Sequence, residues 1–210
     1  MSKKALFVGN GDLESVDLII NKIDNKYDYI IALDGGIRHC KTLNLDVNLI
    51  IGDFDSVTKN DITGYSLIKK NTQDLTDFEF ARDYCYNNFN VTKIDAICMA
   101  SLSRMDHSLF NIYQVLVNLK YEIDMKLITK NHIFMSFGSG KYVIPCKMQQ
   151  TISLMTFVKT FINSTENLRW NLTDHKTEEP WFSISNIAEK NFFNLDIESG
   201  SVLVIINDLD

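Results

Sequence analysis

Five aspartates fall in three short clusters, and each cluster lies where a predicted strand ends or the next helix begins. The clusters are Asp34-Gly35-Gly36, Gly52-Asp53-Phe54-Asp55-Ser56 and Asp74-Leu75-Thr76-Asp77. Carboxylates beside glycines suit a hard cation and a phosphate chain, because glycine lets the backbone come close to a ligand. We therefore predict a site for a hard cation and a phosphate chain rather than a solvated surface.

The pair Asp53 and Asp55 is the most informative of these groups. One residue separates them, so in an extended segment their side chains point the same way and hold one metal ion together. Gathered carboxylates repel one another by about 4 kcal/mol per pair at 4 Å in a dielectric near 20, and a divalent cation removes that cost. Asp74 and Asp77 also suit a helix N-cap and a first-turn acid, and Asp34-Gly35-Gly36 also suits a turn. The order of all three clusters at strand ends favours a site.

The elements that must position these residues alternate along residues 1–130. Short apolar runs are typical of buried strands, and apolar residues spaced three or four apart are typical of helices. The predicted strands are Ala5–Val8, Tyr29–Leu33, Leu49–Ile51, Ser66–Lys69, Ile94–Met99 and Met125–Thr129, and the predicted helices are Asp12–Ile23, Asp74–Phe89 and Asp106–Leu119. This alternation indicates βαβ units and a mostly parallel sheet. Ligands of such sheets bind beyond the carboxyl ends of the strands, so we expect all five aspartates in one crevice.

After residue 130 the pattern changes to short strand-like runs with no convincing helix between them. The runs are His132–Phe137, Lys141–Pro145, Thr151–Val158, Leu168–Leu172, Phe182–Ile184, Phe192–Ile197 and Val202–Ile206. Turn sequences such as Gly138-Ser139-Gly140 separate several of them. Such a pattern predicts an antiparallel sandwich or barrel. We place the change of character between Lys130 and Gly140.

The composition argues against several classes of protein. The chain has 210 residues, a net charge of −6 and no basic tract, so a nucleic-acid partner is not expected. No apolar run approaches the roughly 20 residues that span a bilayer. The run Ala5–Gly9 is interpreted as a first strand rather than a signal peptide. The 4 cysteines and 4 histidines show no metal-ligand spacing, which favours reduced, buried thiols and a cytoplasmic location.

Further motifs follow the aspartate clusters in order. They are Arg104-Met105-Asp106-His107 with Asn111-Ile112, then Leu168-Arg169-Trp170-Asn171-Leu172, then Ser183-Ile184-Ser185-Asn186. With the aspartate clusters, these motifs resemble the thiamine pyrophosphokinase family over nearly the whole chain. Gly52-Asp53-Phe54-Asp55-Ser56 is a strong match in this company, and the later motifs add weight because they fall in order.

The resemblance implies an α/β domain over residues 1–132 that binds nucleotide and metal and carries catalysis. It implies an all-β sandwich over residues 133–210 for thiamine binding and dimerisation. The implied assembly is a homodimer with thiamine sites between subunits. The implied reaction transfers the pyrophosphoryl group of ATP to the thiamine hydroxyl and gives AMP and thiamine diphosphate, with Mg²⁺ as cofactor. No nucleic acid and no membrane are expected as partners.

Roles follow from the resemblance and from the chemistry of each residue type. Arg104 offers forked donors to developing negative charge, and Trp170 offers a cation–π surface worth roughly 0.5–2 kcal/mol to the thiamine rings. Asp34, Asp74 and Asp106 are alternative bases for the hydroxyl proton. The catalytic candidates are Asp34, Asp53, Asp55, Asp74, Asp77, Arg104 and Asp106; the metal ligands are Asp53, Asp55 and Asp77; the nucleotide-binding candidates are Asn10, Gly11, Asp34, Gly35, Gly36, Asp74 and Arg104; and the substrate-binding candidates are Asp106, Trp170, Ser183, Ser185 and Asn186.

Two smaller expectations concern phosphate contacts. Backbone N–H groups at Asn10-Gly11, between a strand and a helix, are expected to meet phosphate. Lys69 or Lys70 is a candidate phosphate contact as well, but a solvated strand end is the favoured interpretation of both lysines.

The chain also departs from the family pattern. Leu102-Ser103 precedes Arg104 where the family often has Gly-Gly, and Glu166 or Asn167 replaces a glycine before the tryptophan motif. Two other functions stay open. One is a pyrophosphokinase for another hydroxymethyl heterocycle such as a pterin, and the other is a non-catalytic sensor of nucleotide or thiamine diphosphate. The intact set of five aspartates argues against the sensor.

Overall fold

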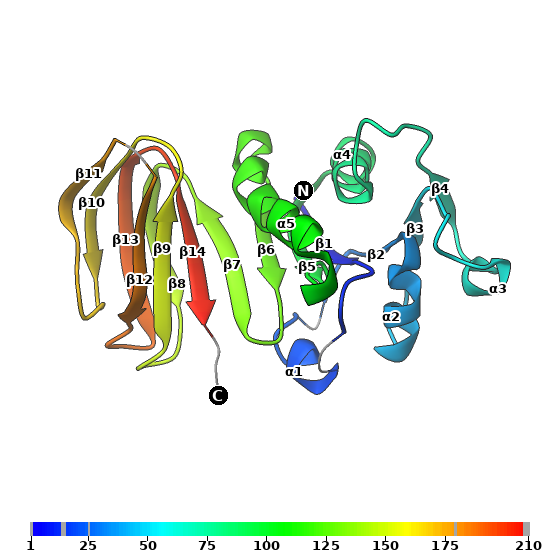
Figure 1. Ribbon diagram of the computed structural model, residues 1–210, viewed down its shortest axis with the longest axis horizontal. Coiled ribbons are helices and arrows are strands. Elements are labelled where there is room, and N and C mark those ends of the chain that lie inside the picture. Colours follow the sequence, from blue (N-terminus) through cyan, green and yellow to red (C-terminus); the bar gives the residue numbers. More distant parts are fainter. Residues whose placement is uncertain (1, 14–15, 25, 179, 208–210) are drawn as a thin grey trace. The chain divides into compact units, whose positions relative to one another are not determined.

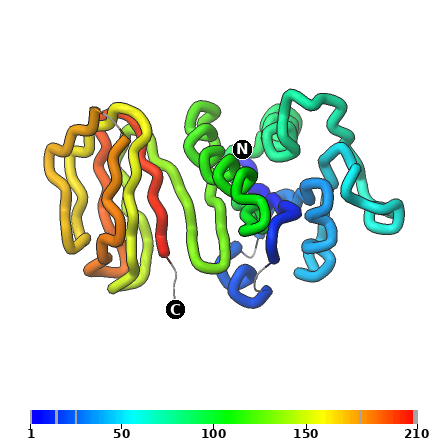
Figure 2. The backbone as a smooth tube through the Cα atoms, in the orientation of Figure 1, coloured from blue at the N-terminus to red at the C-terminus, as the bar shows by residue number. Residues whose placement is uncertain are grey.

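The structure is a computed structural model that describes residues 2–13, 16–24, 26–178 and 180–207 (Figure 1, Figure 2). The chain divides into two units. The first consists of Met1–Ile112 and Glu122–Lys130, and the second of Tyr113–Tyr121 and Asn131–Asp210. The roles predicted for domains 1–132 and 133–210 stay predictions.

The first unit is built on a parallel sheet with helices. Its strands are β1 (Lys3–Val8), β2 (Tyr29–Leu33), β3 (Leu49–Gly52), β4 (Leu67–Lys69), β5 (Val91–Ile97) and β6 (Asp124–Ile128), and its helices are α1 (Val16–Ile20), α2 (Ile37–Thr42), α3 (Lys59–Ile62), α4 (Asp77–Phe89) and the start of α5 (Met105–Val117). The strands follow the order β6-β5-β1-β2-β3-β4, and the pairs are parallel. The order of connection reverses at β1, which lies between β2 and β5.

This topology follows from strands that are apolar on both faces. Ala5, Leu6, Phe7 and Val8 of β1 are fully buried, as a parallel sheet covered on both sides requires. Right-handed crossovers place the helices between β1 and β4 on one face and those after β4 on the other. Figure 1 shows α1 and α2 on one side of these strands and α4 on the other.

The second unit is an antiparallel sandwich. Its strands are β7 (His132–Phe137), β8 (Gly140–Pro145), β9 (Thr151–Thr156), β10 (Thr160–Glu166), β11 (Thr173–Thr177), β12 (Trp181–Ile187), β13 (Phe192–Ser199) and β14 (Val202–Asn207). One layer has the order β12-β9-β14-β7 and the other β11-β10-β13-β8. The core contains Ile152 and Val204 from the first layer and Ile162 and Phe193 from the second. The predicted fold class, an α/β domain with a mostly parallel sheet followed by an all-β sandwich, is confirmed.

The helices of the first unit differ from the predictions in where they begin and end. The helix predicted over Asp12–Ile23 is observed only as α1, and the N–H groups of Gly11 and Asp12 ahead of it donate to Cys98 O and Ala100 O of the loop after β5. Residues 14 and 15 of the predicted helix lie outside the described residues. The helix predicted from Asp74 begins at Asp77, because Thr76 is its N-cap and Glu79 completes a capping box. The helices α2 and α3 were not predicted, since one or two turns carry too few residues to show a period.

The strand predicted over Leu168–Leu172 is wrong. Asn167 is left-handed with φ +64°, and the segment turns the chain from β10 to β11, with an isolated bridge at Leu168. The side-chain oxygen of Asn171 accepts from the Leu168 N–H at 3.2 Å and stabilises this turn. Asparagine tolerates the left-handed region, so Asn167 can make a turn of the kind that glycine commonly makes. Among the described residues, no helix has the length and apolar character needed to cross a membrane.

Candidate active site

A cleft of about 940 Å³ opens in the first unit where the order of connection reverses. Its walls come from the segments that follow β1, β2, β3, β4 and β5. Parallel sheets bind ligands at such a reversal, because the loops after the two adjacent strands lead to opposite faces of the sheet and leave a crevice between them. Asp34, Asp53, Asp55, Asp74 and Asp77 all line this cleft. The structure thus brings the three predicted clusters together.

Three carboxylates in the cleft form a group that suits a cation. One oxygen from each of Asp34, Asp53 and Asp55 lies within 4.8 Å of the others. Asp34 is only 7% exposed, and its Oδ2 accepts from the hydroxyl of Ser56. Its Oδ1 is buried without a hydrogen-bond partner among the described residues. A buried carboxylate oxygen without a donor fits a hard divalent cation such as Mg²⁺.

The protonation of this group reflects crowded negative charge. The pKa of Asp55 is raised, chiefly by the charge of Asp53 and then by burial. The pKa of Asp77 is raised chiefly by burial, and its ion pair with Lys70 opposes that rise. Both shifts mark carboxylates that resist ionisation when no cation is present.

The backbone reaches this arrangement through an unexpected conformation. Phe54 is left-handed with φ +66°, so the segment between Asp53 and Asp55 is not extended as predicted. The turn at Phe54 nevertheless leaves both carboxylates in the group with Asp34. Asp34 is itself left-handed with φ +46°, and a Cβ on Gly52 would lie 2.8 Å from its Cβ. Glycine at position 52 is therefore required for β3 to pass so close to Asp34.

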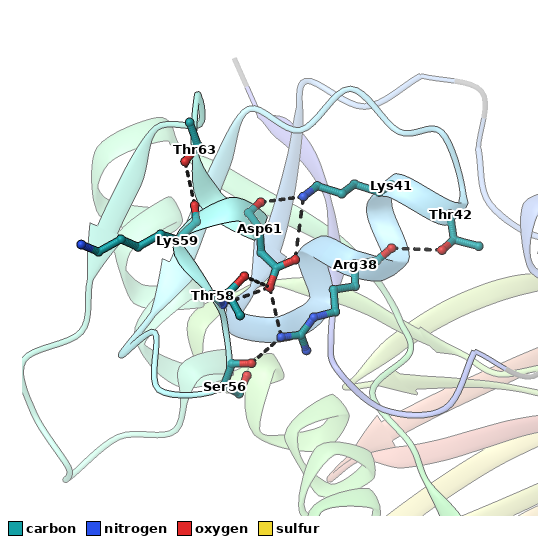
Figure 3. A network of polar contacts seen from close by, with 8 residues as sticks. All are labelled: Arg38, Lys41, Thr42, Ser56, Thr58, Lys59, Asp61 and Thr63. Carbon is teal, nitrogen blue, oxygen red and sulfur yellow. Dashed lines mark hydrogen bonds and ion pairs between the residues drawn. The ribbon is translucent and has the colours of Figure 1, made fainter.

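A polar network anchors the loop that carries Asp53 and Asp55 (Figure 3). Arg38 of α2 donates to Ser56 O at 2.6 Å and to Asp61 Oδ2 at 3.2 Å. The same Asp61 oxygen accepts from the N–H and the hydroxyl of Thr58, both at 3.0 Å, in the capping box of α3. The network fixes Ser56, whose hydroxyl in turn bonds Asp34. Sequence reasoning missed these supporting residues, although Thr58-x-x-Asp61 is a capping-box pattern that would have marked α3.

Carboxylates from two of the predicted clusters lie close to a buried lysine, Lys70. Lys70 Nζ lies 3.0 Å from Asp77 Oδ1 and 3.9 Å from Asp53 Oδ2, and donates to Leu75 O at 3.1 Å. The contact with Asp77 is an ion pair. Lys70 is 7% exposed, so its interpretation as a solvated strand end is wrong. Asp74 is exposed and accepts from the Thr72 hydroxyl at 3.1 Å, and it is not the N-cap of α4.

The glycine-rich segments form the wall of the cleft. Asn10 and Gly11 line it, but the Gly11 N–H donates to Cys98 O at 2.7 Å. The expected phosphate contact through that N–H is therefore not available. Gly35 and Gly36 are buried and do not line the cleft, and a Cβ on Gly36 would lie 2.1 Å from Val8 O. Their place is behind the wall, where they permit close backbone packing.

Arg104 lies at an exposed margin of the cleft. It forms a forked pair with Asp106, with both N–O distances at 3.1 Å, and contacts His107. Arg104 lowers the pKa of Asp106 to about 2, which makes Asp106 a weak base. Asp106 is helical and is not an N-cap; the cap of this region is Ser101, whose hydroxyl accepts from the Ser103 N–H. Asp106 does not line the cleft and instead orients the guanidinium of Arg104.

The remaining candidates lie in the second unit. Trp170 is 58% exposed, whereas Asn186 is buried. The Asn186 side chain donates to Trp170 O at 2.8 Å and accepts from Trp170 N–H at 3.1 Å and Ile187 N–H at 2.8 Å. Asn186 thus fixes the backbone of Trp170, and its amide is already occupied by internal partners. Ser183 and Ser185 fall in an irregular part of β12, where Ser185 has φ +63° and is exposed.

Comparisons with known proteins agree with this geometry. Residues 20–127, more than half of the 210-residue chain, match the family described as "Thiamin pyrophosphokinase, catalytic domain". The fold is similar to thiamine pyrophosphokinase from Bacillus subtilis, with a TM-score of 0.84 and 20% identity over 99% of this chain and 100% of that one. It is also similar to thiamin pyrophosphokinase from Candida albicans, with a TM-score of 0.80 and 19% identity over 99% and 90% of the two chains. No curated protein sequence matches the chain.

Proposed function

The chain belongs to the thiamin pyrophosphokinase family, and from this premise we propose that it transfers the pyrophosphoryl group of ATP to the hydroxyl of thiamine. The products are thiamine diphosphate and AMP. The observation that carries the proposal is the group of Asp34, Asp53 and Asp55 at the point where the sheet reverses. Such transfer depends mainly on positioning and on neutralisation of phosphate charge, and a divalent cation held by this group would supply the neutralising charge.

Magnesium is the proposed cofactor. Asp34, Asp53 and Asp55 are the carboxylates that would hold it, and the unpartnered Asp34 oxygen supports this assignment. When bound, the ion neutralises the phosphate chain and offsets the mutual repulsion of the carboxylates. Asp77 faces the same cleft but is paired with Lys70, so it joins the site as part of an ion pair.

The protein's own groups supply the remaining tasks. Arg104 places a permanent positive charge at the cleft margin, where it can meet the nucleotide phosphates. Of the three candidate bases, Asp106 is disfavoured by its lowered pKa. Asp34 is bonded to Ser56 and belongs to the cation group. Asp74, whose carboxylate is exposed in the cleft and bonded to one hydroxyl, is the proposed acceptor of the thiamine proton.

Thiamine recognition is assigned to the second unit. Trp170 presents an exposed aromatic ring on a backbone held by Asn186, which suits stacking against a cationic heterocycle. Ser183 and Ser185 are proposed to bond the pyrimidine ring, with Asn186 in a supporting role. A homodimer that forms the thiamine sites between subunits is part of the proposal, and the cytoplasmic location stays a prediction.

The test is to incubate the protein with ATP, Mg²⁺ and thiamine and to identify the products by mass spectrometry. AMP and thiamine diphosphate are expected, and EDTA should abolish both. ADP with thiamine monophosphate would overturn the proposed reaction. Transfer to a hydroxymethyl pterin but not to thiamine would assign another acceptor. Binding of ATP and thiamine without release of AMP would identify a sensor.

A further inference from the structure

Lys70 follows β4 and carries a buried ammonium group into the carboxylate cleft. Its backbone N–H donates to Gly52 O at 2.8 Å, which continues the pairing of β4 with β3. Its side chain then lies between Asp77 and Asp53, with Leu75 O as a third oxygen partner. A buried ammonium needs such partners, because an unpaired charge away from water is strongly unfavourable.

The position of Lys70 relative to the cation group gives it a second consequence. Asp53 belongs to the group with Asp34 and Asp55, and it is also within 3.9 Å of Lys70 Nζ. A divalent cation bound by this group and the ammonium of Lys70 would therefore share one carboxylate. Two positive charges this close repel each other, and burial weakens the screening of that repulsion by solvent.

We propose that Lys70 is an internal counter-ion that makes the cleft bind its divalent cation together with the nucleotide rather than before it. Lys70 competes with the free cation for Asp53 and so weakens the binding of cation alone. Once phosphates enter the cleft, the same ammonium adds attraction for their negative charge. The inference rests on the proposed function and deepens it, because it assigns to Lys70 the preference of the site for cation with nucleotide over cation alone.

A simpler role for Lys70 makes a different prediction. If its ion pair with Asp77 only fixes the start of α4, loss of the ammonium should loosen the cleft and weaken every ligand. If Lys70 is a counter-ion, its loss should strengthen the binding of cation alone and weaken the binding of nucleotide. The two effects have opposite signs, which damage to the fold would not produce.

The test compares Lys70→Met with Lys69→Met. Methionine keeps the length of the side chain and removes the charge, and Lys69 is the adjacent, exposed lysine that does not line the cleft. Mn²⁺ binding without nucleotide is measured from the electron paramagnetic resonance signal of free Mn²⁺, and Mg²⁺–ATP binding by calorimetry. We expect Lys70→Met to lower the Kd for Mn²⁺ about tenfold and to raise the Kd for Mg²⁺–ATP about tenfold. Lys69→Met should change either constant by less than about twofold, because an exposed charge is screened.

Weaker or unchanged Mn²⁺ binding by folded Lys70→Met protein would overturn the counter-ion role. Near-ultraviolet circular dichroism checks the fold. If Lys70→Met does not fold, Lys70→Gln, which keeps a polar end, takes its place. Lys70→Arg keeps the charge and should retain the wild-type order of the two affinities. Neither measurement requires thiamine or turnover. Failure of the product assay would therefore overturn the proposed reaction, whereas the binding measurements alone decide the counter-ion role of Lys70.

Discussion

The carboxylate cleft of the first unit and the Trp170 turn of the second unit hold their candidate functional side chains in different ways. In the cleft, the side chains fix one another directly, because the Ser56 hydroxyl donates to the Asp34 carboxylate and Lys70 forms an ion pair with Asp77. At the Trp170 turn, the aromatic ring stays exposed while a neutral amide fixes the backbone beneath it. A functional group can therefore be positioned either by its own contacts or by those of its main chain.

Because the two regions hold their side chains differently, we expect them to respond to different changes. The cleft contains carboxylates whose pKa is raised by charge and burial, so it should respond to metal, pH and the loss of single charges. The Trp170 turn is held by neutral hydrogen bonds and by the surrounding sandwich, so it should respond to shape and to lost aromatic area. Variants in one region should leave the response of the other unchanged.

The largest expected effect is that of Asp55→Asn. The amide keeps the shape of the side chain but removes one charge from the cation group, so turnover should fall by about 100-fold or more. The fold should not suffer, because Asp55 is exposed and its charge is already disfavoured by Asp53. Release of AMP measures turnover, and thermal melting in EDTA measures stability.

The matched control for this change is Asp46→Asn, which removes the same charge from an exposed position that does not line the cleft. It should leave turnover nearly unchanged. Near-normal turnover of Asp55→Asn would show that this carboxylate is not a metal ligand. It would also contradict the expectation that the cleft responds to the loss of a single charge.

A smaller and different effect is expected from Trp170→Ala. Loss of the ring should raise the KM for thiamine roughly tenfold through lost stacking and cation–π attraction. The KM for ATP and the affinity for Mn²⁺ should not change. Stability should be little affected, because Trp170 is 58% exposed. Steady-state kinetics with each substrate varied in turn separates these constants.

Asn186→Leu tests whether the backbone is what positions the ring. Leucine fills a similar volume but leaves the main-chain groups of Trp170 without their amide partners, so it should raise the KM for thiamine in the same direction. An unchanged KM for thiamine in Trp170→Ala would remove the ring from the thiamine site. Loss of Mn²⁺ affinity in that variant would break the separation between the two regions.

The sequence predicted the cleft well because its position depends on topology. Apolar runs such as Tyr29–Leu33 indicate strands covered on both faces, and the residues after such strands must meet at one edge of a parallel sheet. The burial of Lys70 was missed, because neighbouring lysines at a strand end look alike and only the pairing of β4 decides which one points inward. The bond from Ser56 to Asp34 was missed because it joins loops that follow different strands.

The second unit was predicted less accurately for a related reason. The strands β10 and β11 carry polar residues such as Asn163 and Asp174, so their runs lack the apolar character that marks a strand. Leu168 and Leu172 look like a strand but flank a turn that Asn167 begins. The role of Asn186 was also beyond reach, because its partner Trp170 lies 16 positions away in the sequence and the contact is with the backbone.

The smallest expected effect concerns the stability gained from metal. The pKa of Asp55 and of Asp77 is raised above the usual 3.8, so in the metal-free protein these groups keep their protons to higher pH than in the unfolded chain. Their contribution to stability therefore falls as pH rises through the range above 3.8, and the cleft is most strained near neutral pH. Bound Mg²⁺ removes that strain at neutral pH, whereas protons compete with it in acid.

We therefore expect Mg²⁺ to raise the melting temperature by about 2–4 °C more near pH 7 than near pH 4.5, as about 1 kcal/mol would do in a protein of this size. Scanning calorimetry with Mg²⁺ or EDTA at each pH measures the difference. Asp55→Asn should lose most of it, because it removes one of the two strained carboxylates and a ligand at once. Trp170→Ala should keep all of it, since its region carries no carboxylate of the cleft. An equal gain at both pH values in the unaltered protein would contradict the charge-based account of the cleft, and a loss of the difference in Trp170→Ala would show that the two regions are coupled.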